Sequence, residues 1–261
     1  MIDIAEQIIL LTVALFANAL SAMAGGGAGL LQLPALIFLG LPFSIALATH
    51  KIATVALGAG ATLKHSRERH LQLNFALLML GCGLPGVILG ARVILDIPEY
   101  TAKISLGILT IGLGIYSYLK KQLGQNYRPQ QRNIRGYIGG GLGLFLLGFF
   151  NGSLTSGTGL FVTMWLIAWF GFDYKRATAY TMILVGLFWN GTGALTLAML
   201  AEVQWDWLPM LLLGSIVGGY WGAHIAVKYG NPFIKRVFEA ITVLVGLSLI
   251  LHTLFGATPT L

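Results

Sequence analysis

Apolar residues run along this chain in ten segments, separated by short polar or glycine-rich stretches. The segments fall into two series of five: residues 7–23, 28–40, 43–63, 72–93 and 100–119, then residues 137–152, 158–170, 177–200, 207–228 and 234–255. A helix needs about 20 apolar residues to cross the hydrocarbon core of a bilayer. The last three segments of each series are long enough, and the first two are shorter. We therefore expect an all-α polytopic membrane protein.

The two series can be laid over each other as an internal repeat. Three pairs of stretches match in the same order: residues 27–30 with 157–160, 40–51 with 171–182, and 86–92 with 218–224. Because the order is kept and the spacing changes little, the pattern predicts a duplicated unit. Residues 1–119 form the first repeat, 120–135 a basic linker and 136–261 the second repeat, all within one membrane domain.

Loop charges predict how the repeats are oriented, because lysine and arginine favour the cytoplasmic side of a membrane. Residues 64–70 carry three of these cations and the linker 120–135 carries five, so both are expected to be cytoplasmic. The counterpart of 64–70 in the second repeat is the acidic stretch 201–207, and the cations there lie at 228–236 instead. Corresponding loops thus have opposite charge patterns, which predicts two repeats of inverted topology.

The first two segments of each repeat flank a turn rich in glycine, or in glycine and hydroxyl residues. Thirteen helical residues rise only about 20 Å, which is less than a hydrocarbon core of about 30 Å. We favour helical hairpins that enter from opposite faces and turn near the midplane. Hairpins that cross the bilayer fully fit the loop charges equally well.

Backbone that is not helical persists inside a bilayer where it lines a cavity or is buried in protein. Inverted-repeat transporters place such turns around a substrate site, and the helix after each turn directs N–H groups and a partial positive charge toward it. A small oxyanion suits such a site. The candidate substrate-binding residues in the turns are Gly25, Gly26, Gly27, Ser156, Gly157 and Thr158. The alternative is that glycines only allow close helix packing, which is what we expect for Gly86, Gly90, Gly218 and Gly222.

Polar side chains inside the apolar segments provide five further candidates for substrate binding: Gln32, His50, Lys51, Thr181 and Asn190. Ionisable residues within a membrane are candidates for function. Lys51 would balance the charge of an anion, and His50 would carry a coupled proton. As alternatives, Lys51 extends to the interface, and Gln32 and Asn190 hydrogen-bond between helices.

The composition restricts the function classes. Only 10% of the residues are charged and 56% are hydrophobic, whereas soluble domains carry about 25% charged residues. The net charge of +7 lies in loops without a basic face or a stacking platform, so we expect no nucleic-acid partner. The sequence has no catalytic signature, phosphate-binding loop or metal-ligand set, so we expect no enzymatic activity, no cofactor and no metal site.

The stretches "GGGAGLLQLPALIFLGLP", "ALATHK", "NGSLTSGTGLFVTMWLIAWFGFDYKRATA" and "WNGTGAL" resemble the sulfite exporter TauE/SafE family, also called toluene-sulfonate uptake permeases. The resemblance extends from about Ala5 to Leu254. It implies a multi-pass permease of the cytoplasmic membrane whose cargo is sulfite, an organosulfonate or a related sulfur oxyanion. By position, the family's glycine-rich turn falls on Gly25 to Gly29 and its second signature on Gly157 to Gly159. Where the family has asparagine, this chain has His50.

Together these features predict a secondary transporter that binds a small anion near the bilayer midplane, between two glycine-rich helix N-termini. An ion gradient, with a proton or sodium as the coupling ion, or the gradient of the substrate itself would drive it, because no nucleotide-binding loop is present. An anion channel, an integral-membrane enzyme and a scaffolding protein are the alternatives. The exact anion, the direction of transport and a homodimeric state stay open.

Overall fold

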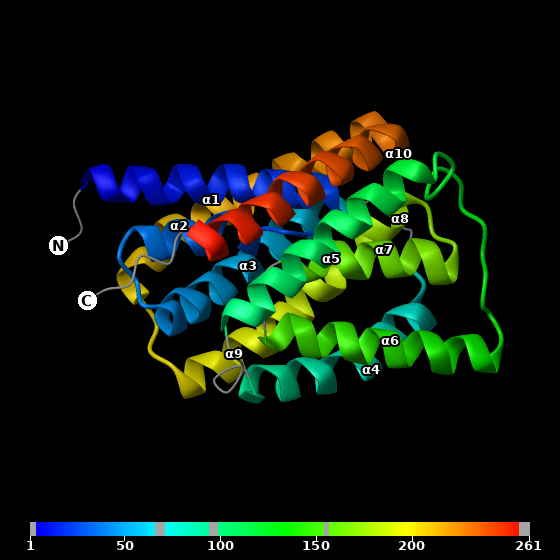
Figure 1. The fold of residues 1–261 in the computed structure, drawn as a ribbon, viewed down its shortest axis with the longest axis horizontal. Coiled ribbons are helices and arrows are strands. Elements are labelled where there is room, and N and C mark those ends of the chain that lie inside the picture. The colour runs from blue at the N-terminus through cyan, green and yellow to red at the C-terminus, as the bar shows by residue number, and fades with distance from the viewer. Residues whose placement is uncertain (1–3, 66–70, 94–98, 154–156, 256–261) are drawn as a thin grey trace.

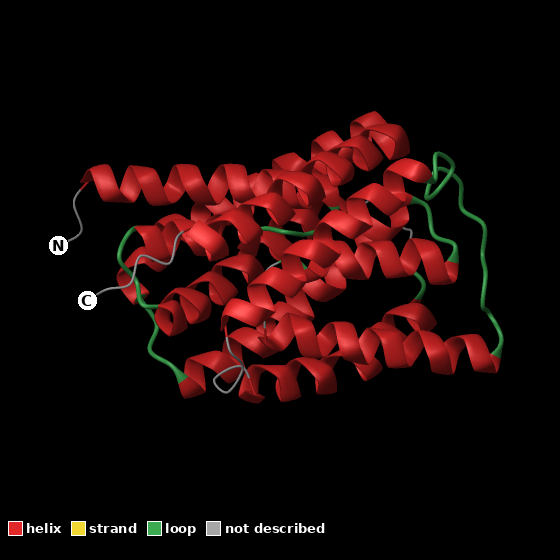
Figure 2. Ribbon diagram, in the orientation of Figure 1, coloured by secondary structure: helices red, strands yellow, loops and turns green. Residues whose placement is uncertain are grey.

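The computed structural model describes residues 4–65, 71–93, 99–153 and 157–255. These residues form helices joined by short loops, and none of them lies in a β-strand (Figure 2). In chain order the elements are α1 (Ile4–Ala24), α2 (Gly29–Phe38), α3 (Phe43–His65), α4 (Leu73–Val93), α5 (Glu99–Leu119), α6 (Ile134–Ser153), α7 (Thr158–Phe170), α8 (Tyr174–Tyr180), the π-helix η3 (Thr181–Trp189), α9 (Asn190–Leu200), the 3₁₀-helix η4 (Trp205–Trp207) and α10 (Leu208–Phe255).

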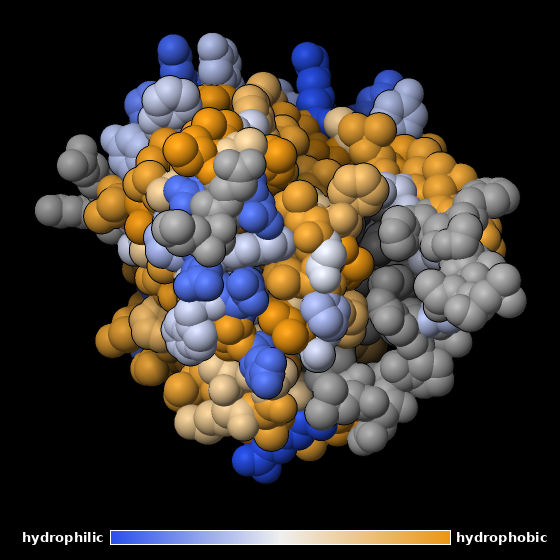
Figure 3. All heavy atoms as spheres, turned by 90° about the vertical axis from the view of Figure 1, so that its left-hand side faces the viewer, coloured by the Kyte–Doolittle hydropathy of each residue, from blue (hydrophilic) through white to orange (hydrophobic). Residues whose placement is uncertain are grey.

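The described residues include five helical runs that are long and apolar enough to cross a membrane: Ile4–Ala24, Phe43–His65, Leu73–Val93, Tyr174–Leu200 and Trp205–Ser248. Large apolar side chains also cover much of the outer surface, such as Phe38, which is 92% exposed, and Met199, which is 74% exposed. Figure 3 looks onto the left-hand end of Figure 1 and shows wide apolar areas between the polar side chains. The predicted all-α polytopic membrane fold is confirmed.

The helices follow the predicted segments closely, with one correction. We expected residues 7–23 and 137–152 not to span a bilayer comfortably. The helices that contain them are longer than these segments: α1 has 21 residues and is among the runs that could cross a membrane, and α6 has 20 residues. The helix α6 starts before its apolar segment because the Asn133 side chain caps it, accepting a hydrogen bond from the Gly136 N–H at 2.7 Å. The second helices of the hairpins are short, as predicted: α2 has 10 residues and α7 has 13.

Glycines let the long helices pack closely in two pairs. The four glycines that we predicted to serve packing all lie at helix contacts: Gly86, Gly90, Gly218 and Gly222. A Cβ atom at Gly90 would collide with the backbone of α6 at Phe149, and one at Gly222 with the backbone of α1 at Ala19. The packing role is confirmed, and it joins α4 to α6 and α10 to α1. Each pair unites a helix of the first half with one of the second.

Basic segments gather at one end of the bundle. The linker between α5 and α6, the start of α8 and the middle of α10 lie together at the right of Figure 1. Hydrogen bonds connect them: Asn231 Nδ2 donates to the Gln125 carbonyl at 2.9 Å, and the Arg128 N–H donates to the Gly171 carbonyl at 2.8 Å. The segment between α9 and α10 lies at the opposite end. This arrangement agrees with the predicted cytoplasmic position of the linker, while the inverted relation of the repeats stays a prediction.

Candidate functional site

The first glycine-rich turn packs against the start of α7 in the interior of the bundle. Gly26 has φ +143°, and a Cβ atom there would collide with the backbone of Gly159 and Leu160. Thr163 of α7 donates a hydrogen bond from Oγ1 to the Gly25 carbonyl at 2.7 Å. Only glycine allows the first turn to come so close to the start of α7 in this conformation. The first glycine-rich turn is therefore in direct contact with the start of α7, the helix that follows the second one.

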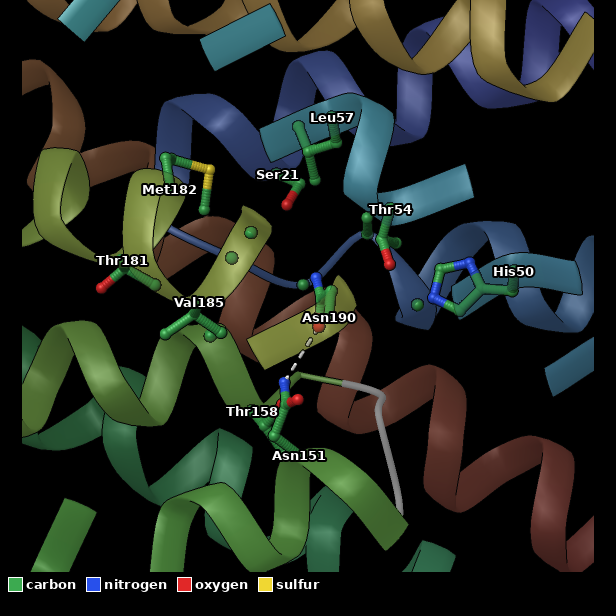
Figure 4. Close-up of a pocket in the computed structure, with 16 residues that line it drawn as sticks. Ser21, His50, Thr54, Leu57, Asn151, Thr158, Thr181, Met182, Val185 and Asn190 are labelled. Atoms are coloured by element: carbon green, nitrogen blue, oxygen red, sulfur yellow. Dashed lines mark hydrogen bonds between the residues drawn. The ribbon is translucent and has the colours of Figure 1, made fainter. Parts of the chain in front are cut away.

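A small cavity of about 30 Å³ lies beside this contact (Figure 4). Its walls come from the first glycine-rich turn, from α1 and α3, from the first residues of α2 and α7, from the end of α6, and from η3 with the start of α9. The structure places six of the residues predicted for binding in these walls: Gly26, Gly27, His50, Thr158, Thr181 and Asn190. Residues far apart in the sequence thus converge on one buried space.

The short helices α2 and α7 both begin at the cavity. Gly29 and Thr158 are their first residues, and both line the cavity wall. The residues before them, Ala28 and Gly157, cap neither helix with a side-chain hydrogen bond. Because the N-terminal turn of a helix carries a partial positive charge, the cavity lies where two such charges converge.

Two buried polar side chains of the cavity wall have no hydrogen-bond partner among the described residues. They are the hydroxyl of Ser21 and the imidazole of His50, both of whose ring nitrogens are unpaired. His50 is 0% exposed, and Figure 4 shows its ring extending from α3 toward the middle of the cavity. Leaving a buried polar group without a partner costs about 1–3 kcal/mol, so a site with two of them is suited to a polar solute.

Asn151, at the end of α6, links the cavity to Lys51. Its Nδ2 donates to Thr158 Oγ1 at 3.0 Å and to Asn190 Oδ1 at 3.3 Å, and the second of these bonds is drawn in Figure 4. From behind, Lys51 Nζ donates to the Asn151 carbonyl at 2.6 Å and to Asn151 Oδ1 at 3.0 Å. Lys51 is 0% exposed and stands behind Asn151 rather than in the cavity wall. It fixes the direction in which the Asn151 amide points.

The remaining predicted residues lie around the cavity or outside the described part of the chain. Gln32 Oε1 accepts a hydrogen bond from Asn18 Nδ2 at 3.1 Å, which is the contact between helices that we named as its alternative. Gly25 holds the contact with α7, and Gly157 precedes α7 with φ +76°. Ser156 is not among the described residues.

The wall opposite the turns is formed by η3, a π-helical segment. Short π-helical stretches inside α-helices are common at functional sites. A Cβ atom at Gly58 of α3 would collide with the backbone of η3 at Gly186, so these two segments touch at backbone distance. This contact holds α3 and η3 together, and His50 of α3 and Thr181 of η3 line the same cavity.

The sequence reading did not single out Ser21, Thr54 or Asn151, which also line the cavity. Ser21 and Asn151 occupy corresponding places, each a polar residue near the end of an apolar helix that leads into a glycine turn. That placement is the signal that identifies them. Other positions of the sequence match also line the cavity in pairs, as Gly29 does with Gly159 and His50 with Thr181.

Comparison with known proteins places these features in a family. The family profile described as "Sulfite exporter TauE/SafE" matches residues 10–249. A "Probable membrane transporter protein ORF9" of Sinorhizobium sp is 27% identical over 92% of this chain and 91% of the relative. The "Probable membrane transporter protein YfcA" of Escherichia coli (strain K12) is 28% identical over 93% of this chain and 88% of the relative. No solved structure matches the chain. Because the profile covers most of the residues, this multi-pass membrane protein belongs to the sulfite exporter TauE/SafE family of membrane transporters, as the sequence motifs predicted.

Proposed function

We propose that this protein is a secondary transporter that moves a small sulfur oxyanion, such as sulfite or an organosulfonate, across the cytoplasmic membrane. The observation that carries the proposal is the convergence of the α2 and α7 N-termini on one cavity, where His50 and Ser21 lack partners. A sulfur oxyanion accepts hydrogen bonds at each of its oxygens. The helix N-termini, the Ser21 hydroxyl and the ring N–H of His50 would supply donors to it.

The charges around the cavity favour an anion over a cation. None of the described residues that line the cavity is a carboxylate. The ammonium of Lys51 is hydrogen-bonded to Asn151, a residue of the cavity wall. A positive charge close to a buried site lowers the free energy of an anion more than it would in water, because the protein interior screens charges weakly.

The size of the cavity favours a compact solute. Its volume of about 30 Å³ is far below the ~300–1,000 Å³ of sites for drug-sized ligands. An inorganic oxyanion or the sulfonate group of a small organosulfonate is of the appropriate scale. The protein would act as a carrier rather than as an enzyme, since binding donors surround the cavity and no nucleophile with an adjacent base is found among the described residues that line it.

Two repeats of inverted topology would give the carrier its alternating access. The pairs of matched positions in the cavity wall and the gathering of basic segments at one end of the bundle support this arrangement. Rocking of one repeat against the other would expose the same site to each side in turn. A proton or a sodium ion moving down its gradient would supply the energy.

Flux into proteoliposomes tests the proposal. The purified chain is reconstituted and supplied with sulfite, sulfate, thiosulfate or a sulfonate, each with and without a gradient of protons or of sodium. We expect saturable flux of one or a few of these anions, and a rate that changes with the gradient of the coupling ion. Flux that rises linearly with concentration would indicate a channel, and no flux above that of protein-free liposomes would contradict transport of these anions.

A further inference from the structure

A second cavity, of about 550 Å³, lies between the end of α5 and the second half of α10. It shares no lining residue with the cavity between the first turns of α2 and α7, which we call the transport cavity. Three cations line it, Lys121, Lys235 and Arg236, against one carboxylate, Glu239. Since the cations outnumber the carboxylate, this cavity is suited to an anion.

At the base of this cavity, Lys235 and Glu239 form an ion pair within a hydrogen-bond network. Lys235 Nζ lies 2.7 Å from Glu239 Oε1 and donates to Ser117 Oγ at 2.9 Å and to the Ser117 carbonyl. Ser117 Oγ in turn donates to Glu239 Oε1 at 2.8 Å and bonds the Tyr174 hydroxyl at 2.7 Å. In this network the charges of Lys235 and Glu239 neutralise each other. The positive charge that faces a ligand therefore comes from the rim.

The rim is formed by Lys121 and Arg236, whose side chains are both exposed. Neither forms a salt bridge or a side-chain hydrogen bond with another described residue. They come from the linker after α5 and from α10, so they approach the cavity from two elements. A guanidinium and an ammonium on facing sides are well suited to the phosphate of a lipid headgroup.

Apolar side chains continue from the cavity along the same two helices. On α5, Leu119 is 70% exposed and Ile115 is 50% exposed, and on α10, Leu244 is 67% and Leu251 is 52% exposed. Tyr118, at the cavity, is 72% exposed, and tyrosine is enriched at the level of lipid headgroups. A polar cavity above an apolar helix surface matches a molecule with a charged head and acyl chains. A free anion would use only the cavity.

From this juxtaposition we propose that the cavity between α5 and α10 binds the phosphate headgroup of an anionic phospholipid. Lys121 and Arg236 hold the phosphate, Gln122 and Gln125 reach the polar part of the headgroup, and the acyl chains lie along α5 and α10. The site is at the basic end of the bundle, where anionic lipids of the cytoplasmic leaflet would meet it. Because the site is remote from the transport cavity, the proposal stands or fails independently of the transported anion.

Thermal unfolding of the purified full chain in detergent tests the lipid site. Phosphatidylglycerol, phosphatidylcholine with the same acyl chains, or inorganic phosphate is added in increasing concentration, and the melting temperature is recorded. The cavity variant is Lys121→Gln with Arg236→Gln. The control variant is Arg128→Gln with Arg135→Gln, which removes the same charge from exposed positions at the same end but outside the cavity.

We expect phosphatidylglycerol to raise the melting temperature at much lower concentration than phosphatidylcholine. The cavity variant should need roughly 10- to 30-fold more phosphatidylglycerol for the same rise, and the control variant should respond like the native chain. Equal responses to the two lipids, or equal losses in the cavity and control variants, would overturn the site. A rise with inorganic phosphate alone that matches phosphatidylglycerol would overturn the lipid in favour of a soluble anion. Melting without added lipid shows whether each variant is folded.

Discussion

Lys51 is a buried cation whose position is explained by the helix that it meets. It is 0% exposed and donates to the backbone carbonyl and the side-chain oxygen of Asn151, in the last turn of α6. The final carbonyls of a helix lack partners within the helix and carry a partial negative charge, so an ammonium is stabilised there. With both oxygens of Asn151 occupied by Lys51, its amide N–H groups point to Thr158 and Asn190. Lys51 thus organises the cavity wall from behind.

Replacing Lys51 should impair transport through Asn151. We expect Lys51→Met to lower the rate of anion flux roughly tenfold or more, because the end of α6 loses a charged hydrogen-bond donor. Lys51→Gln keeps a donor without the charge and should lose less. Initial rates in proteoliposomes with equal amounts of inserted protein give the comparison. Native flux in the methionine variant would show that Lys51 has no such role.

His50 should act on the affinity for the anion. In His50→Leu we expect a KM raised at least about fivefold, since the substitution removes the ring nitrogens that face the cavity. His50→Gln retains a hydrogen-bond donor, so its KM should lie between that of the native chain and that of His50→Leu. The matched control is His224→Leu on α10, because His224 is an exposed histidine remote from the cavity. Equal KM values for the two leucine variants would remove His50 from the binding site.

Sequence alone could indicate which residue types gather at the site, but not where each side chain points. His50, Thr181 and Asn190 were predicted because polar residues are unusual in apolar segments, and they line the cavity. Lys51 was predicted on the same ground, yet it contacts Asn151 instead of lining the cavity. The direction of a side chain depends on how its helix is rotated against its neighbours, and packing between distant segments decides that rotation.

At the scale of helices and turns, the pattern of apolar residues was sufficient for most boundaries. The bounds of α7 agree with the predicted residues 158–170, because glycines adjoin the apolar run at both ends. The predicted break between residues 228 and 234 appears as a kink at Gly230 with φ 74° within α10. The π-helical geometry of η3 could not be predicted, since it has no residue signature and arises in a segment packed tightly against α3.

The contact between the first glycine turn and the start of α7 predicts a strong effect of a single methyl group. In Gly26→Ala, the added Cβ would collide with Gly159 and Leu160, in a backbone conformation that alanine rarely adopts. We expect flux to fall at least about tenfold. Gly81→Ala is the control, because a Cβ atom at this helical position meets nothing within 4 Å. The amount of protein in the membrane and the anion flux are measured for both variants. Equal flux would contradict the close approach of Gly26 to the start of α7.

Across the whole molecule, the positions of the basic segments indicate how the bundle is oriented in the membrane. The linker, the start of α8 and the bend of α10 bring their cations to one end of the bundle, although they are distant in sequence. Loop composition indicated this position for the linker and for residues 228–236, but not for the start of α8, because the cost of moving cations across a bilayer keeps them on one side. The contact of the first glycine turn with α7, in contrast, depends on the packing of α1 with α10 and of α4 with α6, which no single segment reveals.

Cysteine labelling tests the orientation. In a Cys82→Ala background, which lacks the native cysteine, single cysteines are introduced by Asn126→Cys in the linker and by Glu202→Cys after α9, both exposed positions. We expect an impermeant reagent added outside intact cells to label position 202 and to leave position 126 unlabelled until the membrane is opened. Labelling of both from outside would contradict the assignment of the ends.

The position of a bound anion in a crystal tests the proposed transport site. Selenite is the selenium counterpart of sulfite, and its anomalous scattering marks its position in crystals of the intact chain. We predict one strong peak between the first turns of α2 and α7, within hydrogen-bonding reach of Ser21 and His50. A selenite peak elsewhere in the bundle, with none between the two turns, would contradict it.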